Sequence, residues 1–431
     1  MNRELLILAL MVTLGAGAAV ARQSAAPGPN GKNPPSFQSV APDPDGKNSP
    51  SFPDGPQVLT DSSGQPFRVV PLKGLRQPWA LAFLPNGDIL VTEMGGGLRI
   101  IRNWVLDSQP ISGVPDANTR VWRGGLMDVV VHPHYADNKF IYLTYSKLLP
   151  ANPGDPTGKP PAMAVALARG RFEGHALTDV KDVFVSEAGC GGACASRIAF
   201  ARDGTIIMTV GGGRNAQNPA SQLGKILRLN DDGTVPKDNP FVGKSDYRPE
   251  IYALGIRNAI GLFVHPDTGD IWETEHGPMG GDEINIIKPG HNYGWPVVSY
   301  GEDYSGKPTG GSGPQSADRR REGMDEPFFF WHPSPAVGGI VVYTGDKFPD
   351  WKGNVFVAML GAGAHLGARQ VQRLVLSPAG LPQRAGVLTM LYELKQRLRD
   401  IKQGPDGLLY VTVDATQGAV LRIEPVQGSS K

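Results

Sequence analysis

The chain has 431 residues, with 42 Lys and Arg against 41 Asp and Glu, so its formal net charge is +1. This balance excludes a protein that binds nucleic acid mainly through a clustered basic surface. Apolar residues make up 40 % of the chain and charged residues 19 %, which excludes a wholly disordered protein. Its 56 glycines and 39 prolines predict many turns and few long helices.

Residues 1–21 have the pattern of a cleavable export signal. A positively charged start precedes an apolar run at positions 5–14, and the small residues that end at Ala21 fit a cleavage site. A membrane anchor is the alternative, but the run is shorter than the roughly 20 residues that span a bilayer. We therefore expect cleavage after Ala21, a periplasmic or secreted protein, and no stable membrane span after cleavage.

Residues 22–56 predict a disordered or extended linker. A unit rich in Pro, Gly, Asn and Ser occurs twice, at 29–37 and 44–52. Proline donates no backbone hydrogen bond, and such a composition cannot build a packed core. We expect the folded body of the protein to occupy residues 57–431.

The body repeats one pattern six times. Each copy is a short apolar strand, a turn with Pro, Asp, Asn or Gly, and a second apolar strand, which together predict a hairpin. One hairpin cannot bury its own faces, so the copies must pack on one another. The sequence therefore predicts an all-β fold, a six-bladed β-propeller. Two β-sandwiches are the alternative, which the even spacing without a composition break disfavours. The copies begin at Leu81, Val129, Ile198, Leu262, Val341 and Ile401.

The richest polar stretch runs from Gly255 to Asp303. In a propeller, functional residues usually lie in loops at one axial mouth. Glycine-rich irregular backbone exposes carbonyl groups, and Glu283 and Asp303 add carboxylates. Oxygen ligands of both kinds suit Ca²⁺. The alternative is ordinary turn chemistry with solvated acids.

Five segments carry a resemblance to a known family: 224–229, 236–240, 255–258, 275–296 and 397–400. Across roughly residues 65–426 the chain resembles the soluble quinoprotein glucose/aldose sugar dehydrogenases, also called glucose/sorbosone dehydrogenases. The resemblance implies an exported six-bladed propeller that uses pyrroloquinoline quinone (PQQ) and calcium.

The resemblance also implies a cofactor site. By it, Arg257 and Asn258 contact the quinone, Ser334 forms a hydrogen bond to it, and Arg397 and Arg399 pair with its carboxylates. Guanidinium groups match carboxylates in a bidentate geometry, so the chemistry fits a flat tricarboxylate. The alternative for the last two arginines is ion pairing at the edges of blades.

Metal ligands follow from the same resemblance. The carbonyl groups of Gly277 and Pro278 are expected to hold the calcium that polarises the quinone. Glu283, Tyr293 and Asp303 match a second calcium site in some members of the family.

The chain departs from the family pattern on its first blades. The family's general base is a His four residues before the arginine that opens the third repeat; that arginine is Arg197, and the matching position is Ala193. An expected acid appears as Gly212, an expected Gln as Arg123, and an expected Lys falls at Gly361. Alanine cannot accept a proton, so the catalytic base is unknown from the sequence.

Two histidines could replace the missing base, and two cysteines flank the position where it is missing. His276, beside the implied calcium segment, and His332 are the candidates for a substitute base. Cys190 and Cys194 flank Ala193. In an exported protein they predict a disulfide that closes a small loop; a reactive thiol pair and two inert cysteines are the alternatives.

Together these features predict a quinoprotein sugar dehydrogenase. It would oxidise the C1 hydroxyl of an aldose, or a related aldehyde, by hydride transfer to PQQ, and an external electron acceptor would reoxidise the cofactor. Its partners are then a small-molecule sugar and that acceptor, and no nucleic acid. Ala193 leaves two alternatives open: a propeller that binds sugar or PQQ without turnover, and a metal-dependent lactone hydrolase.

Overall fold

The fold is described by a computed structural model, which covers residues 53–119, 124–150, 162–189, 195–310, 313–361 and 368–426. All of these residues lie in one compact unit. The predicted export signal, the linker up to residue 52, Arg123, Ala193 and the two cysteines lie outside the described residues.

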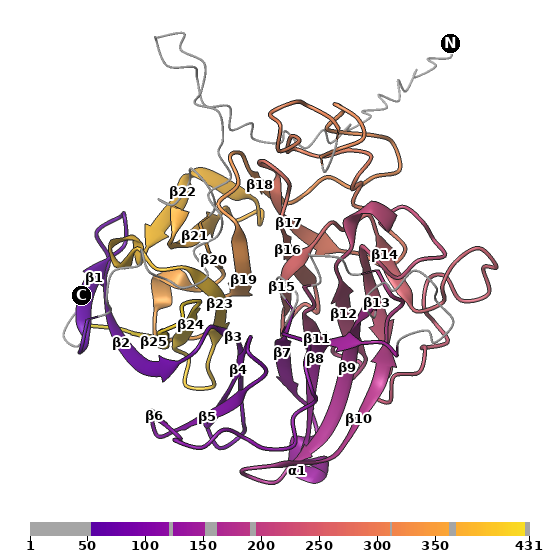
Figure 1. The fold of residues 1–431 in the computed structure, drawn as a ribbon. Helices are drawn as coiled ribbons and strands as arrows, with labels where there is room; N and C mark the ends of the chain where they lie inside the picture. The colour runs from indigo at the N-terminus through magenta and orange to yellow at the C-terminus, as the bar shows by residue number, and fades with distance from the viewer. Residues whose placement is uncertain are drawn as a thin grey trace, which may run out of the picture. The chain divides into compact units, whose positions relative to one another are not determined.

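The described chain folds into six antiparallel sheets, which form the blades of a β-propeller (Figure 1). Each repeated hairpin supplies the two inner strands of one blade, so the predicted fold class is confirmed. Blades 1 to 3 contain β3 (Pro78–Phe83), β4 (Ile89–Glu93), β5 (Leu98–Arg102) and β6 (Val105–Leu106); β7 (Leu126–Val131), β8 (Phe140–Leu148), β9 (Met163–Phe172) and β10 (Leu177–Val185); and β11 (Ile198–Phe200), β12 (Ile206–Val210), β13 (Lys225–Leu229) and β14 (Ile251–Leu254).

The remaining blades follow the same order, from the innermost strand outwards. Short helical turns lie in the loops: α1 (Tyr135–Asn138), η1 (Gly213–Asn215), η2 (Pro349–Trp351) and η4 (Tyr392–Leu394). Blades 4 to 6 contain β15 (Ala259–Val264), β16 (Ile271–Glu275), β17 (Asp282–Ile287) and β18 (Phe329–Trp331); β19 (Val337–Val342), β20 (Val355–Met359), β21 (Val371–Leu376) and β22 (Pro382–Met390); and β23 (Leu398–Gln403), β24 (Leu409–Val413), β25 (Gly418–Glu424), β2 (Pro66–Leu75) and β1 (Gln57–Thr60).

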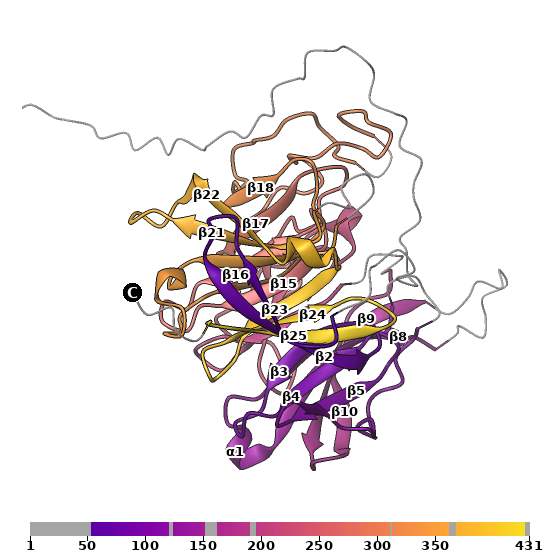
Figure 2. The ribbon, with the colours of Figure 1, turned by 90° about the vertical axis from the view of Figure 1, so that its left-hand side faces the viewer.

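Blade 6 closes the ring by joining the two ends of the described chain. Strand β2 pairs with β25 in the register Val69↔Ile423 (Figure 2), and β1 adds a fifth strand outside β2 (Figure 1). Each innermost strand contacts the next one, and β23 contacts β3. No helix within the described ranges is long and apolar enough to cross a bilayer.

The innermost strands begin irregularly at the end of the ring where the predicted site lies. Five of the six show a register shift near their first residues, and such bulges turn side chains in new directions. In four blades, including blade 3, whose innermost strand has no register shift, a threonine of the second strand accepts an N–H near the start of the innermost strand. The donors are Ala80, Asp128, Arg197 and Asp400, and the acceptors are Thr92, Thr144, Thr209 and Thr412.

A buried ion cluster fills the centre of the ring. Arg197 of blade 3 is fully buried, and its Nη1 lies 3.3 Å from both Asp128 Oδ1 and Asp400 Oδ2. Its Nε donates to the carbonyl oxygen of Ile260 at 2.5 Å, and its guanidinium lies 5.7 Å from the centre of the Trp79 ring. One side chain of blade 3 thus interacts with four other blades and links their innermost strands.

Candidate active site

The predicted cofactor residues gather at one end of the ring. Because the strands of a blade are antiparallel, the start of the innermost strand and the end of the second strand lie at the same end. Asn258 directly precedes β15, and Arg397 directly precedes β23. Glu275 ends β16 and Asp414 follows β24, so each arginine or amide meets a carboxylate there.

Arg397 and Arg399 share one carboxylate. Arg399 Nη2 lies 2.5 Å from Asp414 Oδ2, and Arg397 Nη2 lies 3.2 Å from the same oxygen. Burial opposes ionisation of Asp414, but the two guanidinium groups outweigh it and lower its pKa. The Arg399 guanidinium lies 4.2 Å from the centre of the Trp79 ring, and Arg397 Nη1 donates to the Gly361 carbonyl at 3.1 Å. Two cations with one anion leave an excess of positive charge.

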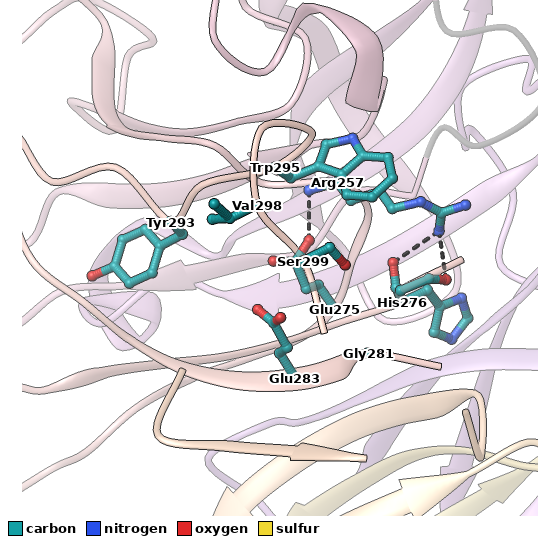
Figure 3. Close-up of a pocket in the computed structure, with 10 residues that line it drawn as sticks. Arg257, Glu275, His276, Gly281, Glu283, Tyr293, Trp295, Val298 and Ser299 are labelled. Atoms are coloured by element: carbon teal, nitrogen blue, oxygen red, sulfur yellow. Dashed lines mark hydrogen bonds between the residues drawn. The ribbon is translucent and has the colours of Figure 1, made fainter. Parts of the chain in front are cut away.

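Arg257 contributes a third guanidinium from blade 4. Its Nη1 donates to the carbonyl oxygens of His276 and Gly277, both at 2.8 Å, and the group lies 5.1 Å from the centre of the Trp295 ring (Figure 3). Its Nη2 lies 3.4 Å from the hydroxyl of Tyr304, which is exposed. Among the described residues the Arg257 guanidinium forms no ion pair, but its charge acts on the nearby Glu275 and Asp282 and opposes the rise in their pKa.

Asn258 and Ser334 complete the predicted cofactor set. Asn258 is 2 % exposed, and its Oδ1 has no hydrogen-bond partner among the described residues. Ser334 forms a hydrogen bond with Asp282, whose carboxylate also accepts the N–H groups of Gly277 at 2.9 Å and Val337 at 3.1 Å. Asp282 therefore ties the expected calcium segment of blade 4 to the start of blade 5.

Four buried carboxylates lie together on β16 and β17. Burial is the main cause of the raised pKa of each: Glu275 to about 7 and Asp282 to about 6, with Glu273 and Glu283 well above their ordinary values. The neighbouring charge of Glu275 further raises the pKa of Glu273 and Glu283. Such a cluster favours a bound cation or shared protons.

A small pocket lies beside these acids. Its volume is about 10 Å³, close to the least that one water molecule or one ion needs. Arg257, Glu275, Gly277, Glu283 and Tyr293 are among the residues that line it (Figure 3). The pocket can hold a monatomic ligand but no organic cofactor.

The predicted second metal set does not converge through its side chains. The hydroxyl of Tyr293 donates to the Ile286 carbonyl at 2.7 Å, and Figure 3 shows it pointing away from Glu283. The Asp303 carboxylate accepts N–H groups of its own loop, from Ser305 and Gly313, both at 2.9 Å. Among the described residues no three His, Cys, Asp or Glu side chains are grouped to bind a metal.

The two candidate bases occupy different positions. His276 Nε2 lies 2.7 Å from the Val337 carbonyl, so this nitrogen carries the proton and Nδ1 is the acceptor in the neutral ring. His332 is exposed beside Gly280, where a Cβ would lie 2.1 Å from His332 Nδ1. Only His276 borders the pocket with Arg257.

The structure also explains one departure from the family pattern. Gly212 has a φ of 126°, and a Cβ there would lie 2.8 Å from the Leu223 side chain. An acid at this position would therefore strain the backbone and displace a buried leucine.

Sequence reasoning missed several residues of the site. Glu275 ends the second strand of its repeat and Asp414 directly follows the second strand of another. That position in the repeat was the signal that could have found them. Trp295 and Asp282 lie inside a segment that the resemblance singled out. The contacts that Trp295 and Asp282 make lie between blades, and no local sequence pattern predicts such contacts.

Comparison with known proteins agrees with this architecture. The family model for glucose/sorbosone dehydrogenases matches residues 75–422. The chain is 38 % identical over 364 residues to the aldose sugar dehydrogenase YliI of Escherichia coli, covering 81 % of this chain and 91 % of that protein. It is 32 % identical over 270 residues to quinoprotein glucose dehydrogenase B of Acinetobacter calcoaceticus, covering 54 % and 53 %. The crystal structure of the soluble aldose sugar dehydrogenase of Escherichia coli in the apo form matches with a TM-score of 0.73 at 35 % identity, over 86 % of this chain and 99 % of that one.

These findings define the class of protein. The chain belongs to the glucose/sorbosone dehydrogenase family, as its motifs predicted, and is an oxidoreductase of the sugar dehydrogenase class.

Proposed function

We propose that this protein is an exported, PQQ- and calcium-dependent dehydrogenase that oxidises an aldose at C1 or a related aldehyde. One observation carries the proposal: three guanidinium groups lie at one end of the ring, where Arg397 and Arg399 share Asp414 and Arg257, beside the buried acids of blade 4, forms no ion pair among the described residues. A flat tricarboxylate such as PQQ complements this charge. The relative of this chain from Acinetobacter calcoaceticus is named a quinoprotein. When bound, the quinone supplies the acceptor for the sugar's hydride.

Each residue has a role in holding the cofactor. Arg397 and Arg399 bind its carboxylates, and Asp414 keeps both guanidinium groups oriented toward the same end of the ring. Arg257 supplies the third cation from another blade. Asn258 and Ser334 provide neutral hydrogen-bonding groups, and the buried, unpartnered Oδ1 of Asn258 is suited to a ligand.

Calcium is proposed at the small pocket of blade 4. Gly277 and Glu283 both line it, and Pro278 continues the same segment. The Gly277 carbonyl also accepts a hydrogen bond from Arg257 Nη1. A divalent cation there would relieve the repulsion between the buried Glu275 and Glu283. The Tyr293 hydroxyl points away from Glu283, and Asp303 is not among the described residues that line the pocket, so we leave both out of the donor set (Figure 3).

His276 is proposed as the proton acceptor. Ala193 stands at the family's base position in the sequence, so another group must take the proton of the C1 hydroxyl. His276 borders the pocket, and its Nε2 contact with the Val337 carbonyl orients Nδ1 as the acceptor. Loss of this proton with the C1 hydride converts the aldose to a lactone, and an external acceptor then takes the two electrons.

Reconstitution tests this proposal. The purified protein is loaded with PQQ and Ca²⁺, and the absorbance of the quinone is followed as aldoses are added one at a time. Bleaching by at least one sugar supports the dehydrogenase. Stable PQQ binding without bleaching would favour the non-catalytic binder, which Ala193 at the base position makes the main alternative. Hydrolysis of a lactone with Ca²⁺ but without PQQ would favour the hydrolase.

A further inference from the structure

A loop of blade 3 is bonded to the segment of blade 4 that carries Trp295. Gln217 Nε2 donates to Asn292 Oδ1 at 2.9 Å, and Asn292 Nδ2 donates back to Gln217 Oε1 at 2.7 Å. Gln217 Nε2 also donates to the backbone carbonyl of Trp295 at 2.7 Å. A reciprocal amide pair satisfies the donor and the acceptor of both side chains, so it fixes the spacing between the two segments.

The same loop lies against the indole and the guanidinium of the site. A Cβ at Gly213 would lie 2.7 Å from Trp295 Nε1 and 3.2 Å from Arg257 Cγ. Glycine is therefore needed for the loop to approach both side chains this closely. The Trp295 ring is buried and lies under the Arg257 guanidinium, at 5.1 Å, where a cation–π contact limits its rotation.

Lys225 secures the loop from below. Its side chain is buried, and Nζ donates to the carbonyl oxygens of Asn215 at 2.8 Å and Leu223 at 2.9 Å. These two carbonyls lie on either side of Gln217 in the chain, so one ammonium group holds both arms of the loop. The loop is therefore anchored within blade 3 before it contacts blade 4.

We propose that Gln217 and Asn292 are positioning residues for Arg257. They hold Trp295 against its guanidinium, so that Arg257 is already oriented to meet an anionic group of the cofactor. A free arginine side chain has many rotamers, and fixing it in advance removes part of the entropic cost of binding. The inference rests on the proposed function, because there Arg257 binds the cofactor.

The first test measures the chemical reactivity of Arg257 in the absence of any cofactor. The protein is labelled with phenylglyoxal, which modifies arginine, and the rate at each site is followed by peptide mass spectrometry. We expect Arg257 to react several-fold faster in Gln217→Ala and in the isosteric Gln217→Glu, which loses both donated hydrogen bonds. Gln372→Ala is the control, because Gln372 is also half-buried but its Oε1 accepts a hydrogen bond from Trp331 on the outermost strand of blade 4, away from the Gln217–Asn292 pair. An unchanged rate at Arg257 in Gln217→Glu would overturn the proposal, and this variant carries the test if Gln217→Ala does not fold.

The second test is a double-mutant cycle on PQQ affinity. If Gln217 acts through Arg257, then Gln217→Ala raises the Kd for PQQ about tenfold in the wild-type background and has no further effect in Arg257→Ala. Effects that multiply would overturn the proposal. If the wild-type protein does not bind PQQ at all, the proposed function fails, but the labelling experiment still decides whether the amide pair orients Arg257.

Discussion

The buried ion cluster at the centre of the ring allows a quantitative prediction for Arg197→Met. Methionine keeps the apolar stem but removes the guanidinium that lies 3.3 Å from both Asp128 and Asp400. Breaking a buried ion pair by removing one partner costs about 3–5 kcal/mol, because a charge stays buried without compensation. Here two carboxylates lose their partner, so we expect the free energy of unfolding to fall by at least about 3 kcal/mol at pH 7.5.

The sign of the pH dependence follows from Asp128. Burial raises its pKa even though the Arg197 charge opposes this, and removing Arg197 raises the pKa further. When a carboxyl group has a higher pKa in the folded than in the unfolded protein, the free energy of unfolding falls as the pH rises from the unfolded pKa to the folded pKa. The variant should therefore be less destabilised at pH 5 than at pH 7.5.

Urea denaturation followed by circular dichroism measures both effects. Asp128→Asn in the Arg197→Met background removes one uncompensated charge and should recover part of the lost stability. The reasoning is wrong if Arg197→Met costs less than about 1 kcal/mol at pH 7.5, or if the cost is the same at both pH values.

Three other substitutions test separate parts of the structure. Burial lowers the pKa of Lys225 to about 7, so above that pH the unfolded chain binds more protons than the folded protein. The free energy of unfolding of the wild type, relative to that of Lys225→Met, should therefore rise by about 2 kcal/mol from pH 7 to pH 9. A difference that does not change with pH would contradict this assignment. Glu283→Gln should weaken Ca²⁺ binding at least tenfold in calorimetry, whereas an unchanged affinity would move the ion away from the pocket. Gly212 has a φ of 126° and lies against Leu223, so Gly212→Asp should lower the free energy of unfolding by about 1–3 kcal/mol, measured by thermal denaturation. A variant as stable as the wild type would show that this position tolerates the family's acid.

The blades could be predicted because their inner hairpins are local structures. Apolar strands and turn residues such as those between Leu81 and Val91 lie within a few positions of each other, so one stretch of sequence contains the whole signal. The closure of the ring could not be read in this way. Val69 pairs with Ile423 across almost the entire chain, and neither strand has a turn that points to the other.

The same distinction between local and long-range contacts applies to the site. The family resemblance pointed to Arg257 and Arg397, and each lies directly before or next to the first strand of a repeat. The contacts that decide their behaviour lie between blades or in long loops. Asp414 is shared by two arginines, and Trp295 lies under Arg257 through a loop of another blade. The hydroxyl of Tyr293 bonds to a backbone carbonyl instead of approaching Glu283, which depends on a rotamer that no motif specifies.

The affinity of the purified protein for PQQ, measured by calorimetry with Ca²⁺ present, tests the central claim most directly. The three guanidinium groups at one end of the ring should bind the cofactor with a stoichiometry of about one, and Arg397→Ala should weaken this binding at least tenfold, because a charge-assisted contact to a carboxylate is lost. If the wild-type protein takes up no PQQ, or if Arg397→Ala binds it as tightly, this end of the ring is not the cofactor site.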